Sequence, residues 1–311
     1  MSQRTICSKC QNKQSVYFRQ YSGEYLCRPC FIFSIEEKTS RTISKFSMIN
    51  YGDRIAVGVS GGKDSLSLLL VLKHLFERKK TNDIIAITID EGIAGYRDES
   101  LKIVKEFCTK LNIKNEIFSY RELFGMDMDE SMILRPSKKM TSCSICGTFR
   151  RRAIDIATDY VGANVIATGH NLDDQLQSFM INIISGDVNR IGWIHPESVY
   201  YGTKKIKKIK PFIEIYEREI VFYALQQNIP FQSEQCPYQD ESIRSEIREF
   251  FNSLEDNRSG VKYNTFSSIL KISKILKNND NSLKNTCDVC GYESTGPICS
   301  VCNNLRILRN A

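Results

Sequence analysis

The chain has 311 residues, of which 41% are hydrophobic and 25% are charged, with 17 Gly and 7 Pro. This composition is typical of a soluble globular protein and excludes collagen-like, low-complexity and largely disordered chains. The net charge of +7, from 43 basic and 36 acidic residues, indicates a polyanionic partner without identifying it.

The sequence shows no segment typical of a membrane or secreted protein. Its longest leucine-rich run, Leu66–Leu72, is far too short to span a bilayer. The first residues contain no apolar stretch of the kind that a secretory signal requires. We therefore expect a cytoplasmic protein without a membrane partner. In that reducing compartment, 12 cysteines favour metal binding or redox chemistry over disulfides.

The first and the last segments of the chain each carry two C-x-x-C pairs. Each pair presents two thiolates to one side of a turn, and two pairs complete a tetrahedral four-cysteine zinc site. Segments this short bury too little surface to fold alone, so metal binding would contribute roughly 10–16 kcal/mol at neutral pH. Disulfides and free buried thiols are the alternatives, but the repeated spacing favours two Zn²⁺ ions. The predicted ligands are Cys7, Cys10, Cys27, Cys30, Cys287, Cys290, Cys299 and Cys302.

Between these ribbons, β-branched runs alternate with amphipathic stretches. The runs predict strands over residues 55–59, 84–89, 114–118 and 165–167. Apolar spacing predicts helices over residues 66–79, 100–111, 146–160, 173–184, 217–228, 243–254 and 263–276. Such alternation predicts an α/β fold with a parallel sheet covered on both faces. Ligands of such sheets bind beyond the carboxyl ends of the strands.

The first predicted strand runs through the sequence SGGKDS, residues 60–65, directly into a helix. Glycines let the backbone close around an anion, and the helix N-terminus directs unpaired N–H groups at it. Lys63 adds a positive charge, and the serines add hydroxyl donors. Asp64 stands where a Walker A loop would have Ser or Thr, so the loop is of another type. An ordinary glycine turn is the alternative, and the strand–loop–helix context favours phosphate binding.

Three further cysteines lie in the central segment. Cys143 and Cys146 form a pair with no second pair nearby, and Cys236 is the next cysteine along the chain. A zinc ion would need a fourth protein ligand, and none is evident in the sequence. The three thiolates could instead hold an iron–sulfur cluster with one iron free, or form a disulfide or persulfide pair with a helper thiol. Cys108, within an amphipathic stretch, is predicted to be a buried core thiol.

Four motifs follow the SGGKDS loop in order. They are DEGIAGYR at residues 90–97, CSICGTFRRR at 143–152, TGHNLDD at 168–174 and SEQCPY at 233–238. Together with both ribbons, these motifs resemble the tRNA 2-thiouridine synthetase family of the N-type ATP pyrophosphatases, over essentially the whole chain. The three arginines after Cys146 are more similar to those of the enzymes that modify the wobble uridine.

The resemblance implies a tRNA sulfurtransferase that releases AMP and pyrophosphate. Enzymes of this family bind ATP at the SGGKDS loop, adenylate the C2 oxygen of a tRNA uridine and replace that oxygen with sulfur. It also implies Mg²⁺, a 4Fe–4S cluster on Cys143, Cys146 and Cys236, and a homodimer. A ubiquitin-like protein with a C-terminal thiocarboxylate would be the sulfur donor. The expected fold is a PP-loop ATP pyrophosphatase domain with N- and C-terminal four-cysteine zinc ribbons.

The family motifs also imply site residues. The expected catalytic set is Cys143, Cys146, Cys236, Asp64 and Asp174. The expected nucleotide-binding set is Gly58, Ser60, Gly61, Gly62, Lys63, Asp64, Ser65, Asp90, Arg150, Gly169 and Asp174. Lys63 and magnesium would meet the charge that develops on pyrophosphate, and Arg150 would neutralise the α-phosphate. Asp64 and Asp174 would bind or position magnesium, with helix capping as the alternative for both.

Two positions near this site are open. The family usually has Glu after the second aspartate of TGHNLDD, whereas this chain has Gln175, a neutral side chain that cannot balance a metal charge. We therefore leave Gln175 out of the expected site. His170 fits a hydrogen-bonded structural role as well as it fits a catalytic one.

The motifs divide the chain into five expected regions. These are an N-terminal zinc ribbon (1–32), a helical connector (33–50), the PP-loop ATP pyrophosphatase domain (51–235), a helical extension and linker (236–284) and a C-terminal zinc ribbon (285–311).

Basic residues gather in several places. Residues 150–152 form one cluster, Lys271, Lys274 and Lys277 share a helical face, and Arg306 and Arg309 lie near the end. A further cluster comprises Lys204, Lys205, Lys207, Lys208 and Lys210. Such runs usually mark a solvated face. In the context of the motifs, we expect a basic surface that contacts tRNA phosphates.

Other functions remain to be weighed. A tRNA-lysidine synthetase or a small-molecule amidotransferase would explain the loop but not the cysteine trio, and a 2-thiocytidine enzyme would not explain both ribbons. Thiolation of the T-loop uridine is an alternative within the family. A non-catalytic zinc-ribbon RNA-binding adaptor would not need an intact loop, Asp174 and three central cysteines. The enzyme hypothesis requires that Cys236 lie near Cys143, Cys146 and Ser60.

Overall fold

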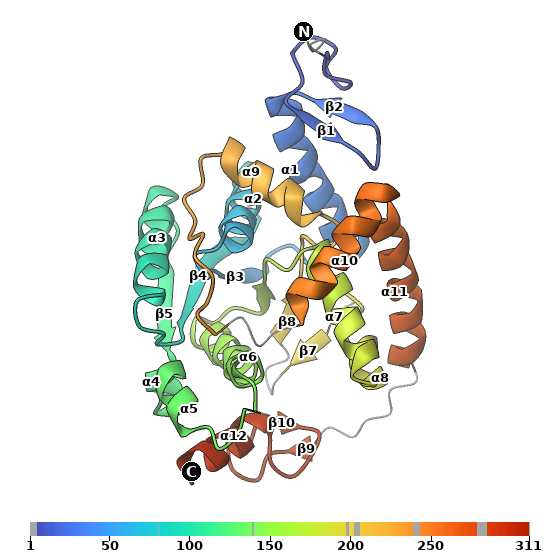
Figure 1. Cartoon of the computed structure of the whole chain (residues 1–311). Coiled ribbons are helices and arrows are strands. Elements are labelled where there is room, and N and C mark those ends of the chain that lie inside the picture. Colours follow the sequence, from blue (N-terminus) through green and yellow to red (C-terminus); the bar gives the residue numbers. More distant parts are fainter. Residues whose placement is uncertain are drawn as a thin grey trace.

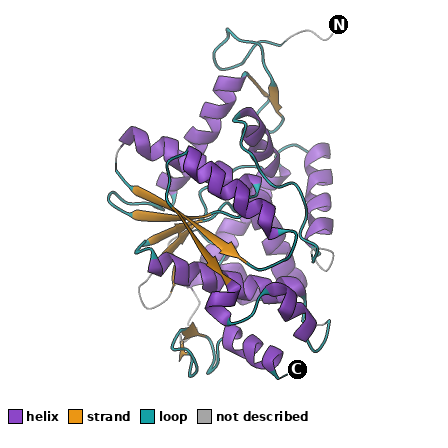
Figure 2. Cartoon of the chain, turned by 90° about the vertical axis from the view of Figure 1, so that its left-hand side faces the viewer, coloured by secondary structure: helices purple, strands orange, loops and turns teal. Residues whose placement is uncertain are grey.

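A computed structural model describes residues 5–79, 81–138, 140–196, 199–201, 206–238, 243–278 and 285–310. A six-stranded sheet lies at the centre of the molecule, with helices on both of its faces (Figures 1 and 2). The two cysteine ribbons lie at opposite ends of the molecule, the N-terminal one at the top of Figure 1 and the C-terminal one at the bottom.

The central sheet has the strand order β5-β4-β3-β6-β8-β7. Its strands are β3 (Arg54–Gly58), β4 (Asp83–Asp90), β5 (Asn115–Ser119), β6 (Val165–Ala167), β7 (Val199–Tyr201) and β8 (Ile206–Ile209). All pairs are parallel except β7 with β8, so β7 is an antiparallel edge. The predicted parallel-sheet α/β fold is confirmed, and the predicted strands are present within a residue or two.

The seven predicted helices are all present, and several begin earlier than predicted. They are α2 (Lys63–Lys79), α3 (Arg97–Lys110), α6 (Ser142–Tyr160), α7 (Leu172–Ile184), α9 (Glu217–Gln226), α10 (Arg244–Asn257) and α11 (Val261–Asn278). The earlier start of α6 follows from Thr141, whose side chain accepts a hydrogen bond from the Ser144 N–H as an N-cap. This start places Cys143 and Cys146 in the first turns of a helix.

Further elements were not predicted individually. Helices α4 (Tyr120–Phe124), α5 (Met128–Leu134), α8 (Val188–Gly192) and α12 (Ser300–Arg309) are short or terminal. The ribbons contain the hairpins β1 (Tyr17–Arg19) with β2 (Glu24–Leu26), and β9 (Asn285–Thr286) with β10 (Glu293–Ser294). Helix α1 (Arg28–Lys45) begins inside the expected N-terminal ribbon and crosses its expected boundary. None of the helices among the described residues is long and apolar enough to cross a membrane.

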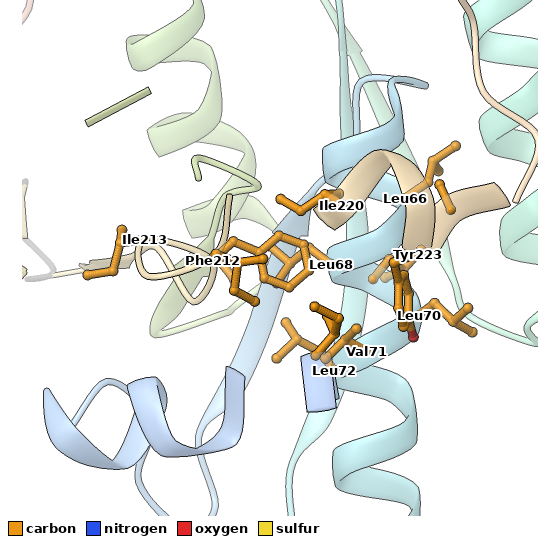
Figure 3. Close-up of a cluster of buried hydrophobic side chains, with 14 of the residues drawn as sticks. Leu66, Leu68, Leu70, Val71, Leu72, Phe212, Ile213, Ile220 and Tyr223 are labelled. Carbon is orange, nitrogen blue, oxygen red and sulfur yellow. The ribbon is translucent and has the colours of Figure 1, made fainter. Parts of the chain in front are cut away.

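The helix that follows the SGGKDS loop is anchored in the largest core cluster. Leu66, Leu68 and Leu72 of α2 are fully buried. They pack in one cluster with Phe212, Ile213, Ile220 and Tyr223, which come from the chain before α9 and from α9 itself (Figure 3). A helix that is apolar on most sides must be buried. The core therefore fixes α2, and with it the loop at its N-terminus.

Candidate nucleotide and cysteine site

The SGGKDS loop closes on itself between β3 and α2. Ser65 organises it, since its Oγ accepts a hydrogen bond from the Ser60 N–H at 3.1 Å and donates to the Gly62 carbonyl at 3.0 Å. The Ser60 hydroxyl lies 3.2 Å from the Ser65 hydroxyl. The loop thus leads from the carboxyl end of β3 to the N-terminus of α2, where backbone N–H groups are available to an anion.

Two glycines of the expected site are required by close approaches. Gly61 has a φ of +89°, and a Cβ there would lie 2.7 Å from Cβ of Ser100. Gly169, which follows β6, lies against the loop, because a Cβ there would lie 2.9 Å from the Ser65 backbone nitrogen. The chain after β6 therefore packs directly on the first turn of α2.

Lys63 lies between two carboxylates. Its Nζ donates to Oδ2 of Asp64 at 2.9 Å and to Oε1 of Glu217, at the start of α9, at 2.8 Å. Burial alone would lower the pKa of Lys63, but the two carboxylates outweigh it and raise that pKa. Asn171 donates to the other Asp64 oxygen at 3.0 Å. Sequence reasoning missed Glu217 and Asn171, although Asn171 belongs to the TGHNLDD motif.

Asp174 caps α7 and also faces the loop. Its Oδ2 accepts from the Asn171 N–H at 2.9 Å, and the Asn171 side chain accepts from the Asp174 N–H, so the two form a capping box. Burial, together with the nearby charges of Asp64 and Glu217, raises the pKa of Asp174 to about 6. The capping alternative is thus present for Asp174, and the same carboxyl lies beside Asp64.

Two further aspartates of the motifs, Asp173 and Asp90, form hydrogen bonds that support the local structure. Asp173 is buried; it pairs with Lys262 and accepts a hydrogen bond from the Glu217 N–H at 2.7 Å. It therefore joins α7 to α11 and α9. Asp90, at the carboxyl end of β4, accepts from the Gly92 N–H at 2.9 Å.

A chain of charged contacts joins the loop to the central cysteine pair. Arg97 is buried; it donates to the Ser60 carbonyl at 3.0 Å and pairs with Glu91 at 2.8 Å. The second oxygen of the buried Glu91 accepts from Arg150 at 2.9 Å. Arg150 in turn donates to the sulfur of Cys146 at 3.2 Å. Because Arg97 and Glu91 are buried, this series of contacts fixes the SGGKDS loop relative to α6.

The three central cysteines come from two segments that the structure brings together. Cys143 and Cys146 lie on α6, and the segment with Cys236 reaches α6 where Ser142 Oγ donates to the Tyr238 carbonyl at 3.0 Å. The same segment touches the SGGKDS loop, because the Gln232 N–H donates to the Gly61 carbonyl at 3.1 Å. Burial raises the pKa of Cys236, and the proximity of the Cys146 and Cys143 thiols raises it further.

The spacing of these sulfurs differs from that in the ribbons. Among the described residues, only the two terminal cysteine sets bring their ligand atoms within 4.8 Å of one another. In a cluster each thiolate binds a different iron atom, so the three sulfurs need not lie within reach of a single ion. Three thiolates in one place leave a fourth iron without a cysteine ligand. The donor set therefore fits an iron–sulfur cluster.

The terminal sets are compact enough for a single ion. Cys10 and Cys27 lie 3.7 Å apart between their sulfurs, and so do Cys290 and Cys299. Zinc–sulfur bonds of about 2.3 Å at tetrahedral angles place sulfurs about 3.8 Å apart. The Cys299 N–H donates to the sulfur of Cys287 at 3.2 Å. The sulfur spacing of both sets is therefore that of a site for one metal ion.

The structure gives Gln175 and His170 definite partners. Gln175 is buried and accepts a hydrogen bond from Lys210 at 3.1 Å, and burial lowers the pKa of Lys210 to about 8. His170 Nδ1 lies 2.8 Å from the Thr168 hydroxyl. Desolvation, then the charges of Lys210 and two nearby arginines, lowers the pKa of His170 to about 3. The residue is nonetheless exposed, and the lowered pKa keeps its ring neutral at physiological pH.

The expected basic surface is wrong at two lysines of the 204–210 cluster. Lys207 is 5% exposed and donates to the Ser47 carbonyl, and Lys208 pairs with Asp155 at 2.5 Å. Both belong to strand β8, and these partners hold their ammonium groups within the fold. Lys204 and Lys205 lie outside the described residues. Arg150 is bound to Glu91, as described above, whereas Lys271, Lys274 and Arg306 are exposed.

Comparison with known proteins agrees with this architecture. Residues 35–254 match the model of the PP-loop domain family, and residues 6–32 match that of the N-terminal LIM domain of 2-thiouridine synthetase TtuA. The chain is 36% identical over 308 residues to cytoplasmic tRNA 2-thiolation protein 1 of Aspergillus niger, covering 96% of this chain and 87% of that protein.

Two archaeal proteins are similar along nearly their whole length. A probable sulfurtransferase of Methanocaldococcus jannaschii is 34% identical over 301 residues, which cover 96% of this chain and 86% of that protein. Among solved structures, the U34-tRNA thiolase NcsA of Methanococcus maripaludis, described with its [4Fe-4S] cluster, superposes with a TM-score of 0.83. It is 31% identical and covers 98% of this chain and 97% of that chain.

The sheet order and the loop between β3 and α2 define a PP-loop nucleotide-binding enzyme. The match extends beyond that domain into both ends of the chain. The chain therefore belongs to the tRNA 2-thiolation family of PP-loop tRNA sulfurtransferases.

Proposed function

We propose that this protein adenylates the C2 oxygen of the wobble uridine of a tRNA and replaces that oxygen with sulfur. The proposal is supported by the names of its relatives, which are a cytoplasmic tRNA 2-thiolation protein and a thiolase of uridine 34. Those names also support a cytoplasmic location. The observation that carries the proposal is the segment from Gln232 to Tyr238, which contacts the SGGKDS loop at one end and α6 at the other.

The first step is activation of a poor leaving group. The uridine C2 oxygen would attack the α-phosphorus of ATP and displace pyrophosphate, so that the oxygen can later leave as AMP. Backbone N–H groups of residues 60–65 and the Lys63 ammonium would stabilise the charge on pyrophosphate. Lys63 would exchange its contact with Glu217 for a phosphate. Asp64 and Asp174 would hold Mg²⁺, and Arg150 would contact the α-phosphate.

The second step needs sulfur close to the adenylated base. Cys143, Cys146 and Cys236 would hold an iron–sulfur cluster, and the bound cluster would supply a site that carries sulfur. Sulfur would bond to C2, and AMP would leave with the former C2 oxygen. The 3.2 Å contact of Arg150 with the sulfur of Cys146 supports this step, because Arg150 is the cation that we propose for the α-phosphate. We propose the C-terminal thiocarboxylate of a ubiquitin-like protein as the sulfur donor.

The remaining ligands and the assembly state are part of the same proposal. Each ribbon would bind one Zn²⁺, in agreement with the sulfur distances of 3.7 Å. We propose a homodimer, which light scattering of the purified protein would detect as twice the chain mass of 35.7 kDa.

Mass spectrometry of tRNA nucleosides from a deletion strain tests the function. We expect 2-thiouridine derivatives at the wobble position to disappear and to return with the wild-type chain but not with Cys146→Ala. Cys108→Ala is the matched control, because Cys108 is a core thiol that is 2% exposed and has no part in the proposed reaction. Loss of thiolation at a T-loop uridine or a cytidine instead would contradict the assigned position. Unchanged thionucleosides would contradict the function.

A further inference from the structure

The C-terminal ribbon is joined to the helix that carries Cys143 and Cys146. Arg152, on α6, donates through its two terminal nitrogens to the sulfurs of Cys290 and Cys299, each at 3.4 Å. Its guanidinium also lies over the ring of Tyr292, 3.4 Å from the ring centre. A single side chain of α6 thus contacts two of the ribbon's four clustered cysteines and the aromatic ring between them.

A second residue of α6 extends this junction to the central sheet. Asp155 is buried one turn after Arg152, and it accepts a hydrogen bond from the Tyr292 hydroxyl. Its other oxygen pairs with Lys208 of β8 at 2.5 Å. Tyr292 therefore connects the ribbon to α6, and Asp155 connects α6 to the sheet.

Apolar packing continues the junction along α6 towards its N-terminus. Val301 and Leu308 of α12 are buried in the same core cluster as Ile145 and Phe149 of α6. Ile145 lies between the two cysteines of the C-x-x-C pair. Arg309 of α12 donates to the Phe124 carbonyl at 3.0 Å, at the end of α4. Figure 1 shows the ribbon and α12 beneath the lower end of α6.

We propose that Arg152 is a positioning residue that fixes α6 to the C-terminal four-cysteine site, so that metal binding in the ribbon orders Cys143 and Cys146. Four thiolates on a divalent ion carry a net negative charge, which a guanidinium bound to two of the sulfurs offsets. A planar fork with parallel donors can span two sulfurs, whereas a lysine ammonium is a single point. The ribbon then acts on the cysteine site through α6. The proposal rests on the proposed function only in requiring a zinc ion in the ribbon.

Hydrogen–deuterium exchange of the full, zinc-loaded chain tests this role. In Arg152→Ala, we expect the amides of residues 147–156 to exchange about tenfold faster or more, as loss of hydrogen bonds to charged groups predicts. Arg152→Lys keeps the charge without the fork and should restore only part of the protection. Arg151→Ala, a neighbouring exposed arginine on the same helix, is the matched control and should leave exchange unchanged.

A second readout concerns the central cysteines. After anaerobic reconstitution, Arg152→Ala should retain less iron per chain than the wild type and Arg151→Ala, although all cysteines are intact. Unchanged exchange over residues 147–156 in Arg152→Ala would overturn the proposal, whether or not zinc is retained. Exchange requires no tRNA and no sulfur donor. Faster exchange in Arg152→Ala would therefore support this inference even if the wild-type chain failed to thiolate tRNA, a result that would contradict only the proposed function.

Discussion

At the residue scale, Gly169 has little freedom, because backbone atoms of the loop lie against it. A Cβ there would lie 2.9 Å from backbone atoms of Asp64 and Ser65, which cannot move without shifting the loop. Overpacking of this kind costs about 1–3 kcal/mol, so Gly169→Ala should weaken ATP binding by roughly 5- to 150-fold. Calorimetric titration with ATP measures the change. Gly296→Ala is the control, because a Cβ at Gly296 meets nothing within 4 Å. Equal affinities would show that the loop adapts.

A second prediction concerns Glu91, whose two oxygens bind Arg97 and Arg150. Glu91→Gln removes the charge that balances two arginines, one of them buried, and leaves the Arg97 guanidinium without a counter-ion. Breaking a buried ion pair costs about 3–5 kcal/mol. We expect the free energy of unfolding in urea to fall by about this amount. Glu99→Gln, an exposed position on α3, should change it by less than about 0.5 kcal/mol. A similar small change for Glu91→Gln would contradict the buried triad.

The site residues that the sequence predicts lie in contiguous motifs, whereas those that it does not predict reach the site through long-range contacts. Lys63, Asp64 and Asp174 belong to contiguous motifs, and their chemistry is evident from residue type. Glu217 approaches Lys63 from a helix more than 150 positions away. No local pattern marks such a carboxylate, which in the sequence is one more acidic residue at a helix start. Long-range ion pairs of this kind become visible only in the folded chain.

At the element scale, helix α7 begins with a residue that has two functions. The Asn171 side chain accepts from the Asp174 N–H as an N-cap and donates to Asp64 at 3.0 Å. Asn171→Asp keeps the acceptor for the cap but replaces the donor with a charge that repels Asp64. We expect altered binding of Mg²⁺ and ATP, measured by calorimetry at fixed pH.

The alanine variant separates the two functions of Asn171. Asn171→Ala loses the cap as well, and N-cap losses cost about 0.5–2 kcal/mol of stability. We therefore expect it to unfold at lower urea concentration than the wild type. Unchanged stability would argue that the cap contributes nothing to α7. Unaltered Mg²⁺ and ATP binding in Asn171→Asp would argue against an interaction with Asp64.

Elements differ in how well their sequences predict them. Helix α2 was predictable because its leucines repeat at helical spacing, and only its first turn was missed. Strand β8 was not, because its sequence Ile-Lys-Lys-Ile resembles a basic surface run. In the fold, Lys207 reaches the Ser47 carbonyl and Lys208 reaches Asp155, so both ammonium groups are satisfied inside the structure. The aliphatic stems of lysine let it occupy a sheet while its charged end finds a partner.

At the scale of the whole molecule, the ribbons were predictable as metal sites but not as parts of the core. The N-terminal ribbon packs on α9, where Arg19 pairs with the fully buried Glu219 at 2.7 Å and Tyr21 stacks on Tyr216 with ring centres 4.8 Å apart. Cysteine spacing indicates the ligands of an ion, but it says nothing about the surface against which the ribbon packs. Both ribbons thus belong to the same folded unit as the sheet.

This integration predicts the effect of losing one metal ion. Cys27 is 2% exposed and lies in the main core cluster. Cys27→Ser should leave one Zn²⁺ per chain instead of two, as measured by atomic emission, because two groups of four cysteines are present. Since metal binding in such segments supplies folding energy, the thermal midpoint of the whole chain should fall, not only that of the ribbon.

Cys108→Ala, also at a buried core thiol, is the control and should retain both ions. A separate early transition for the N-terminal ribbon, with an unchanged main transition, would contradict a shared core. In that case the contacts of Arg19 and Tyr21 with α9 would contribute little to the stability of the PP-loop domain.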